Sequence, residues 1–150
     1  MATPSILITG GCGFIGTSLI VQLLQVNPGI SIRVIDNFTT GTPNDLARIA
    51  HYSQHTSQDC LDKQGVVLIE GDVRDAKTVK QCSEGVDHIV HLAANTGVAP
   101  SVDNPRLDME CNVTGTLNML EAARLNGVKK FIFASSGAPA GEVEPPIHEE

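Results

Sequence analysis

Five short runs of apolar residues recur along the chain, with helix-like stretches between them. The runs are rich in Ile, Val, Leu and Phe and occupy residues 5–9, 30–35, 66–69, 88–92 and 130–134. Near-continuous apolar runs of this length are typical of strands that are buried on both faces of a parallel sheet. The intervening patterns and turn residues predict helices at 14–25, 43–52, 76–82 and 106–126.

This alternation predicts a doubly wound α/β fold of the Rossmann type. We expect five parallel strands in the order 3-2-1-4-5, within a domain spanning residues 1–136. The polar stretch at 51–64 is expected to be an irregular surface segment. Residues 137–150 contain three prolines, and four of the last ten residues are acidic, so we expect a loop there.

Composition narrows the classes of function. Hydrophobic residues make up 41% of the 150 and charged residues 18%, as expected of a single globular domain. The net charge of −7 disfavours nucleic acid and anionic membranes as partners, and no apolar run is long enough to span a bilayer. Four scattered cysteines, without a C-x-x-C pair, favour a cytoplasmic protein with reduced thiols and predict no metal site.

A glycine-rich turn joins the first strand to the first helix. Gly10, Gly13 and Gly16 form a G-x-x-G-x-x-G pattern between a buried strand and an amphipathic helix. In such a turn the first glycine permits the tight bend, the second lets the backbone approach a pyrophosphate, and the third lets the helix pack closely. The free N–H groups and positive end of the helix then face the phosphates. The alternative is a glycine-rich turn without a ligand.

Asp36 ends the second strand, 20 residues after Gly16. An acid at this distance accepts hydrogen bonds from the adenosine ribose hydroxyls in dinucleotide-binding folds. The same carboxylate repels a 2′-phosphate, and the following Asn37 and Phe38 offer no cation to hold one. NAD is therefore predicted over NADP, with an ordinary strand-end acid as the alternative.

Two further positions lie at the carboxyl ends of strands. Asp72, after the third strand, fits two roles, as an acceptor for the adenine amino group or as a helix cap. His91, near the end of the fourth strand, is predicted to be a packed or capping histidine. The small residues after it would let a cofactor lie close to the backbone.

Six motifs carry a resemblance to a known family. They are T-G-G-C-G-F-I-G, D-N-F-T-T-G, G-D-V-R-D, H-L-A-A, N-V-T-G-T-L-N-M-L-E-A-A-R and F-I-F-A-S-S, in this order. The chain resembles the extended short-chain dehydrogenase/reductases, in their NAD-dependent nucleotide-sugar epimerase/dehydratase branch. The resemblance covers essentially all 150 residues.

The resemblance implies a set of cofactor contacts. The pyrophosphate would lie at the glycine turn and the backbone of Phe14 and Ile15, and the ribose at Asp36 and Asn37. Adenine would lie at Asp72 and the Val73 backbone. Residues lining the cofactor beyond the phosphates would be Leu92, Ala93 and Ala94. Asn112 corresponds to a family asparagine that braces the region after the fourth strand.

The resemblance also implies catalytic residues, of which this chain has only one. Ser136 aligns with the Ser/Thr that hydrogen-bonds the reacting sugar hydroxyl. The family's Tyr-x-x-x-Lys pair is absent, since the only tyrosine is Tyr52 and the residue four positions later is Thr56. Many relatives have V-Y-G where this chain has residues 139–141. The pair, a sixth strand and the C-terminal lobe for the nucleotide sugar are expected after Glu150.

Two classes of function remain open. The first is the cofactor-binding part of a longer NAD-dependent enzyme that acts on a nucleotide sugar, with a UDP-sugar 4-epimerase as first choice and a homodimer as the expected assembly. The second is a non-catalytic NAD-binding module or redox sensor. A weaker third hypothesis is an interaction protein that uses the helix at 106–126.

Overall fold

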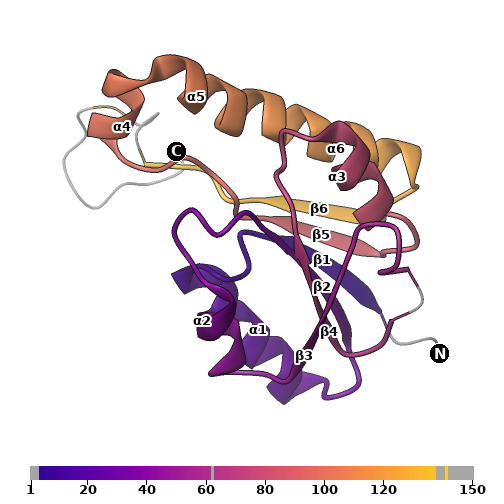
Figure 1. The fold of residues 1–150 in the computed structure, drawn as a ribbon. Coiled ribbons are helices and arrows are strands. Elements are labelled where there is room, and N and C mark those ends of the chain that lie inside the picture. Colours follow the sequence, from indigo (N-terminus) through magenta and orange to yellow (C-terminus); the bar gives the residue numbers. More distant parts are fainter. Residues whose placement is uncertain (1–3, 62, 138–140, 142–150) are drawn as a thin grey trace.

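The computed structural model describes residues 4–61, 63–137 and 141, which form an α/β fold around one parallel sheet (Figure 1). The sheet has six strands in the order β3-β4-β2-β1-β5-β6. Their bounds are β1 Ser5–Thr9, β2 Ser31–Asp36, β3 Tyr52–His55, β4 Val66–Glu70, β5 His88–His91 and β6 Lys130–Phe133. All five neighbouring pairs are parallel.

Helices cover both faces of the sheet. Figure 1 shows α1 and α2 on one face and α3 with the long α5–α6 segment on the other. The helices are α1 Phe14–Val26, α2 Pro43–Ala47, α3 Ala76–Cys82, α4 Val98–Asp103, α5 Pro105–Met109 and α6 Gly115–Leu125, with a π-helical turn, η1 Glu110–Thr114, between α5 and α6. This confirms the predicted doubly wound fold.

The core consists of two layers, one on each side of the sheet. Alternate strand residues face opposite layers, because side chains in a strand point to opposite faces in turn. Ile6 and Ile8 belong to the layer under α1, whereas Leu7 between them belongs to the layer under α3 and α6. All three are buried, which explains why the strands are continuous apolar runs.

The prediction for the polar stretch at 51–64 was wrong. Tyr52–His55 forms β3, an additional strand paired with β4 at the edge of the sheet. The five expected strands keep their predicted order as β4-β2-β1-β5-β6, so the sheet has six strands rather than five. The polar sequence Y-S-Q-H concealed β3, an edge strand in which the side chains of Ser53 and Gln54 are exposed.

Several helix predictions also need correction. The helix after Pro43 ends at Ala47 rather than at Tyr52. The short α4 was not predicted; it starts after Gly97, whose φ is 106°, and has Pro100 in its first turn. The expected helix at 106–126 is interrupted by η1, where the N–H of Gly115 donates to the carbonyl of Glu110, five residues earlier. The other predicted ends agree within one residue. The expected loop at 137–150 lies mostly outside the described residues.

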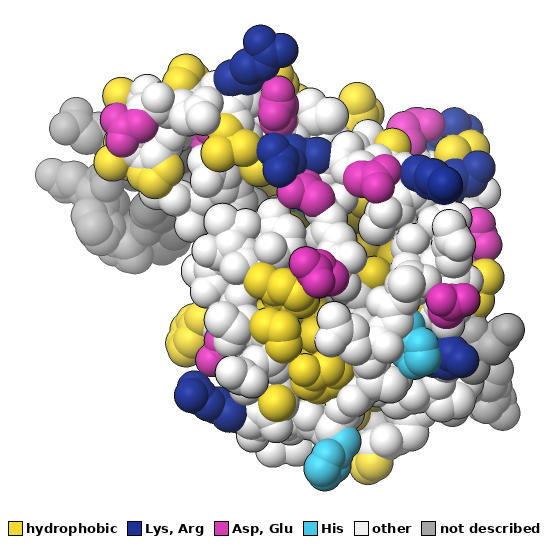
Figure 2. Space-filling view, viewed as in Figure 1, with side chains coloured by type: hydrophobic (Ala, Val, Ile, Leu, Met, Phe, Trp, Pro, Cys, Tyr) yellow, Lys and Arg dark blue, Asp and Glu magenta, His cyan; other side chains and the backbone are white. Residues whose placement is uncertain are grey.

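Apolar side chains remain exposed on the outer side of the α5–α6 segment and on β6. Leu117 and Leu120 are 58% and 46% exposed, and Phe133 on β6 is 52% exposed. Figure 2 shows hydrophobic side chains among charged ones over the helices at the top of the molecule. Within the described residues, no strand pairs with the outer side of β6. Exposed patches of this kind favour association.

We therefore expect the 150-residue chain to self-associate. In sedimentation velocity, its average mass should rise with concentration, and L117K/L120K should keep the chain monomeric. Val26→Lys is the matched control, because Val26 is 87% exposed at the end of α1, on the other face of the sheet. A wild-type chain that stays monomeric at all concentrations would contradict the prediction.

Candidate functional site

A cavity of about 790 Å³ opens at the carboxyl ends of the strands, which is where open α/β sheets bind their ligands. Twelve of the thirteen positions predicted to contact a cofactor line it. They are Gly10, Gly13, Phe14, Ile15, Gly16, Asp36, Asn37, Asp72, Val73, Leu92, Ala93 and Ala94. The thirteenth, Asn112, contacts the cavity wall from behind. The fold therefore gathers at one edge residues that are up to 84 positions apart in the sequence.

The glycine turn is packed too tightly for side chains. Gly10 has a φ of 68°, and a Cβ there would lie 2.9 Å from the backbone nitrogen of Ala93. A Cβ on Gly16 would lie 2.5 Å from the Cα of Gly11. Gly13 differs, because a Cβ there would meet one protein atom, the carbonyl oxygen of Gly10, at 3.3 Å. Glycine at 13 therefore leaves open space beside the backbone, as the close approach of a ligand requires.

A close contact between the glycine turn and another glycine, Gly41, was not predicted from the sequence. Gly41, in the loop after β2, packs on the turn so closely that a Cβ would lie 2.3 Å from the carbonyl carbon of Cys12. The D-N-F-T-T-G motif ends on this residue, which was the signal available in the sequence. The contact brings the loop at 37–41 to the mouth of the cavity, where Thr39, Thr40 and Gly41 form part of the lining.

Helix α1 presents an unneutralised N-terminus to the cavity. The carbonyl of Gly13 accepts the N–H of Thr17, so the N–H groups of the three residues between them have no acceptor within the helix. Gly13 provides no side-chain cap, and the first turn contains no acidic residue. Phe14 is 87% exposed at this point. The helix dipole and free donors together suit an anion such as a phosphate.

Asp36 connects the end of β2 to the glycine turn. One carboxylate oxygen accepts the N–H of Cys12 and the other accepts the N–H of Phe38, each at 2.9 Å. Burial raises the pKa of Asp36 above its usual value, while these two hydrogen bonds lower it. Because each oxygen can accept a further hydrogen bond, the carboxylate can hold the turn and still bind hydroxyl donors in the cavity.

The side chain of Asp72 accepts more hydrogen bonds from neighbouring side chains than the sequence indicated. Its carboxylate receives Nε and Nη2 of Arg74 at 2.9 and 2.7 Å, and Nδ2 of Asn37 at 3.1 Å. The hydrogen bonds from Arg74 lower the pKa of Asp72 to about 2. The next helix is capped by Asp75 instead, whose side chain accepts the N–H groups of Lys77 and Thr78. The cap alternative for Asp72 was therefore wrong, and Arg74 was a missed lining residue.

The hydroxyl of Thr9 links the ends of β1 and β5. It accepts the N–H groups of Leu92 and Ala93 at 3.2 and 3.1 Å and lies 2.7 Å from Nδ1 of His91. Having accepted twice, the hydroxyl has its own proton left to donate to Nδ1. The proton of the neutral ring is then on Nε2, which lies 3.1 Å from the hydroxyl of Thr116.

The ring of His91 is a structural element of this site. Burial lowers the pKa of His91 to about 4, so the ring is neutral at pH 7. It packs beside Phe131 and Phe133 of β6, with ring centroids 6.1 and 6.0 Å away. The hydroxyl of Thr116 in turn donates a hydrogen bond to the carbonyl of Asn112 at 2.7 Å. This confirms the prediction that His91 is a packed histidine.

Asn112 holds the segment that follows β5. Its side-chain oxygen accepts the N–H of Asn95 at 2.8 Å, and its Nδ2 donates to the carbonyl of Asn95 at 3.0 Å. Nδ2 also lies 3.1 Å from Asp108, which binds the Asn95 side chain as well. Asn112 thus closes a ring with the backbone of one residue and fixes the wall formed by residues 92–96.

Ser136 and Tyr52 lie at opposite edges of the sheet. Ser136 is exposed and follows β6, and it is not among the residues that line the cavity, although Ala134 is. Tyr52 starts β3 at the other edge, where it packs against the core layer under α1. The strand order therefore separates the only tyrosine from the candidate catalytic serine.

The sequence matches the family model for the NAD dependent epimerase/dehydratase family over residues 6–150. The chain belongs to this family. Its relatives include UDP-glucose 4-epimerase 3 of Oryza sativa subsp. japonica, which is 32% identical over 95% of this chain and 37% of its own length. A dTDP-glucose 4,6-dehydratase of Mycobacterium tuberculosis is 34% identical over 83% of this chain and 34% of its own length.

A solved epimerase has the same fold. The UDP-glucose 4-epimerase of Thermus thermophilus, crystallised in complex with NAD, superimposes with a TM-score of 0.75 at 36% identity. The match covers 97% of this chain and 42% of that protein. The chain thus spans well under half the length of the epimerase/dehydratase relatives it matches.

Metal clusters and membrane-spanning helices are both absent from the described residues. In the portion of the chain that the structure describes, no group of three or more His, Cys, Asp or Glu side chains could hold a metal ion. None of the described helices is long and apolar enough to cross a membrane.

We expect Gly16→Ala to lower the free energy of unfolding by about 1–3 kcal/mol, since the new methyl group would meet backbone atoms that cannot move independently. Urea denaturation measures the change. Gly29→Ala is the control, because the nearest atom to its Cβ, Oδ1 of Asn27, is 3.7 Å away. Equal stability of both variants would contradict the packing argument.

We expect the stability of the chain to fall with acid between about pH 6.5 and pH 4 because of His91. The folded protein keeps this ring neutral below the ordinary pKa of 6.5, whereas the unfolded chain takes up a proton. Stability is thus complete above this range, and lowering the pH from 7 to 5 removes about 2 kcal/mol.

Denaturation curves at both pH values check this expectation. His91→Gln should remove most of the pH dependence, and His51→Gln, at an exposed position, should leave it unchanged. A His91→Gln protein with the wild-type pH dependence would show that another group titrates.

Proposed function

We propose that this chain is the cofactor-binding part of an NAD-dependent enzyme of the epimerase/dehydratase family. The observation that carries the proposal is that the uncapped N-terminus of α1 and the carboxylate of Asp36 line one cavity. The helix end offers free N–H donors to phosphates, and Asp36 offers a carboxylate to hydroxyl groups. A dinucleotide has both kinds of group, and the missing Cβ at Gly13 leaves room beside the backbone.

The proposed contacts match phosphates to the N–H donors and hydroxyl groups to the carboxylate. The backbone at Phe14 and Ile15 holds the pyrophosphate, and Asp36 and Asn37 hold the adenosine ribose. The edge formed by Asp72 and Val73 receives adenine, while the backbone at 92–94, supported by Asn112 through Asn95, lines the cofactor beyond the phosphates. NAD held by these residues would supply the acceptor for a hydride from a sugar carbon.

Ser136 is the proposed contact to the substrate within this chain. It follows β6, two residues after the cavity-lining Ala134, and its proposed role is that of the serine which hydrogen-bonds the reacting sugar hydroxyl in the family that the sequence resembles. The 150 residues contain no Tyr-x-x-x-Lys pair to take the hydroxyl proton, and Tyr52 is at the other edge of the sheet. We therefore infer that these residues alone bind the cofactor without catalysing the reaction.

A nucleotide sugar is the proposed substrate, and UDP-sugar 4-epimerisation the preferred reaction. The support is the naming of relatives as UDP-glucose 4-epimerases in a plant and in Thermus thermophilus. The dehydratase relative keeps 4,6-dehydration open, and 2-epimerisation of a CDP-sugar and decarboxylation are further alternatives within the family that the sequence resembles. The homodimer and the cytoplasmic location stay predictions.

The second candidate is a non-catalytic NAD-binding module or redox sensor. Its support is that the 150 residues form the candidate cofactor cavity without containing a Tyr-x-x-x-Lys pair. A reading frame that continues past Glu150 into such a pair would support the enzyme, and a stop codon there would support the module.

We expect the chain to bind NAD more tightly than NADP in calorimetric titration, and Asp36→Ala to weaken NAD binding by about 10- to 100-fold. This range corresponds to the loss of hydrogen bonds to a charged group. The variant should also bind NAD and NADP more equally, because the carboxylate that repels a 2′-phosphate is gone.

Glu70→Gln is the control, since Glu70 is an exposed acid at the end of β4 that does not line the cavity. It should bind NAD as the wild type does. Unchanged affinities for both nucleotides in a folded Asp36→Ala protein would refute the ribose contact. If the folded wild-type chain binds neither nucleotide, the proposed cofactor function of these residues fails.

A further inference from the structure

A buried arginine lies outside the candidate site, in the middle of β2. Arg33 is 5% exposed and pairs in register with Leu7 of β1 and Val67 of β4. Both neighbours belong to the core layer under α3 and α6, so the guanidinium leaves the sheet on that face. A charged side chain is rarely buried unless other groups compensate its charge.

The compensation for Arg33 is incomplete. Its Nη1 donates to the carbonyls of Cys82 and Glu84, and its Nη2 donates to the carbonyl of Leu61 at 2.7 Å. Its Nε is buried with no hydrogen-bond partner in the described chain. Among the described residues, no carboxylate forms an ion pair with Arg33. Within the described residues, the guanidinium therefore has no anionic partner.

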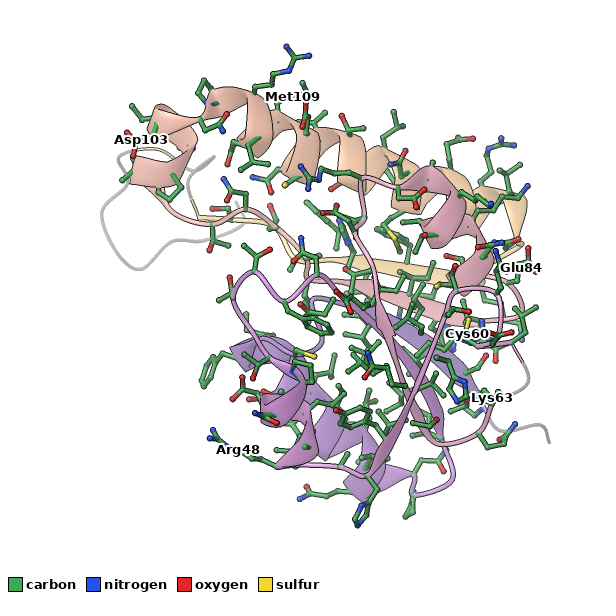
Figure 3. All side chains as sticks on the ribbon, viewed as in Figure 1. Arg48, Cys60, Lys63, Glu84, Asp103 and Met109 are labelled. Atoms are coloured by element: carbon green, nitrogen blue, oxygen red, sulfur yellow. The ribbon has the colours of Figure 1, made fainter. Side chains whose placement is uncertain are left out.

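The contacts of Arg33 bring two cysteines together. The carbonyls that it binds belong to Leu61, next to Cys60, and to Cys82 itself. Both cysteines are fully buried in the core layer under α3 and α6, and the Cys60 thiol donates to the carbonyl of Ser57 at 3.3 Å. Cys60 and Glu84 lie at the same corner of the molecule in Figure 3. A hydrogen bond of 2.7 Å between Ser57 and Gln81 ties the same two segments.

The two thiols have different electrostatic environments. Interaction with Cys82, supported by the charge of Arg33, lowers the pKa of Cys60, although burial opposes this. Interaction with Cys60 and burial raise the pKa of Cys82. Cys60 is thus the thiol of the two that more readily forms a thiolate, and a thiolate is the nucleophile in disulfide exchange.

We propose that Cys60 and Cys82 are a redox-active pair that closes to an intramolecular disulfide, with Arg33 as the positioning cation. With glutathione disulfide as oxidant, the Cys60 thiolate attacks one sulfur, forms a mixed disulfide and releases one glutathione thiolate. Cys82 then loses its proton and attacks the sulfur of Cys60, which releases the second glutathione. The protein dithiol gives up two electrons, and one glutathione disulfide becomes two glutathione thiols.

The disulfide between Cys60 and Cys82 would link the connection between β3 and β4 covalently to the end of α3. Cys60 lies in this connection, one layer below the surface, since its neighbours Asp59 and Leu61 are exposed. Because both cysteines are fully buried, the reaction with the oxidant requires local opening around Cys60. This redox pair is separate from the NAD-binding edge, because neither cysteine lines the cavity there.

The test uses the folded 150-residue chain, treated with glutathione disulfide and then denatured and alkylated. Mass spectrometry should find two alkylated thiols instead of four, a loss of two hydrogens from the chain, and a cross-linked pair of peptides containing Cys60 and Cys82. The C12A/C111A variant should form the same bond. Cys82→Ala should stop at a glutathione adduct on Cys60.

Arg33→Lys separates the role of the cation from that of the pair. A lysine keeps the charge but loses the forked contacts to both segments. In this variant, we expect closure of the disulfide to be slowed relative to formation of the adduct on Cys60. Denaturation of the oxidised wild-type chain, which should unfold at higher urea than the reduced chain, gives an independent readout.

Three results would overturn the proposal. They are four reduced thiols after treatment of the folded chain, a disulfide that includes Cys12 or Cys111, and a wild-type chain that stops at the mixed disulfide. If C12A/C111A does not fold, the peptide map of the wild-type chain alone decides which sulfurs are joined.

Discussion

The hydroxyl of Thr9 holds together the two chain segments between which the cavity opens. It accepts the N–H groups of Leu92 and Ala93, so the backbone after β5 is drawn against the turn after β1. The fit there is too tight for a methyl group on Gly10. Because the hydroxyl also binds His91, the constraint extends through Thr116 to the α5–α6 segment. One side chain thus aligns a strand end, a glycine turn and a helix.

The carboxylate of Asp36 has a comparable double function on the other side of β1. Its bonds to the N–H groups of Cys12 and Phe38 fix the turn and the following loop, and both lie at the mouth of the cavity. A ligand that binds this carboxylate would meet an acceptor already oriented by the protein. Preorganisation of this kind reduces the entropy lost on binding.

The sequence was sufficient for the sheet order and for most of the cavity lining, because both follow from local patterns. Buried strands must be apolar on both faces, and the glycine spacing at 10–16 reflects steric limits within one turn. The features that were missed depend on partners distant in sequence. Strand β3 is polar and owes its existence to pairing with β4. Gly41 is required by the turn at Cys12, and Asp72 is occupied by Arg74 and Asn37.

The π-helical turn between α5 and α6 has a consequence for insertions and deletions in this segment. The bond from the Gly115 N–H to the carbonyl of Glu110 spans five residues, so the turn contains one residue more than an α-helix needs. Deleting one residue from 110–114 would restore a regular helix and leave α5 and α6 in nearly the same relative orientation, because the wide turn already absorbs the extra residue. Asp108 would stay beside Asn95, and Met119 would stay packed in the core. The wide turn therefore lets this segment carry one more residue without misaligning the helices on either side.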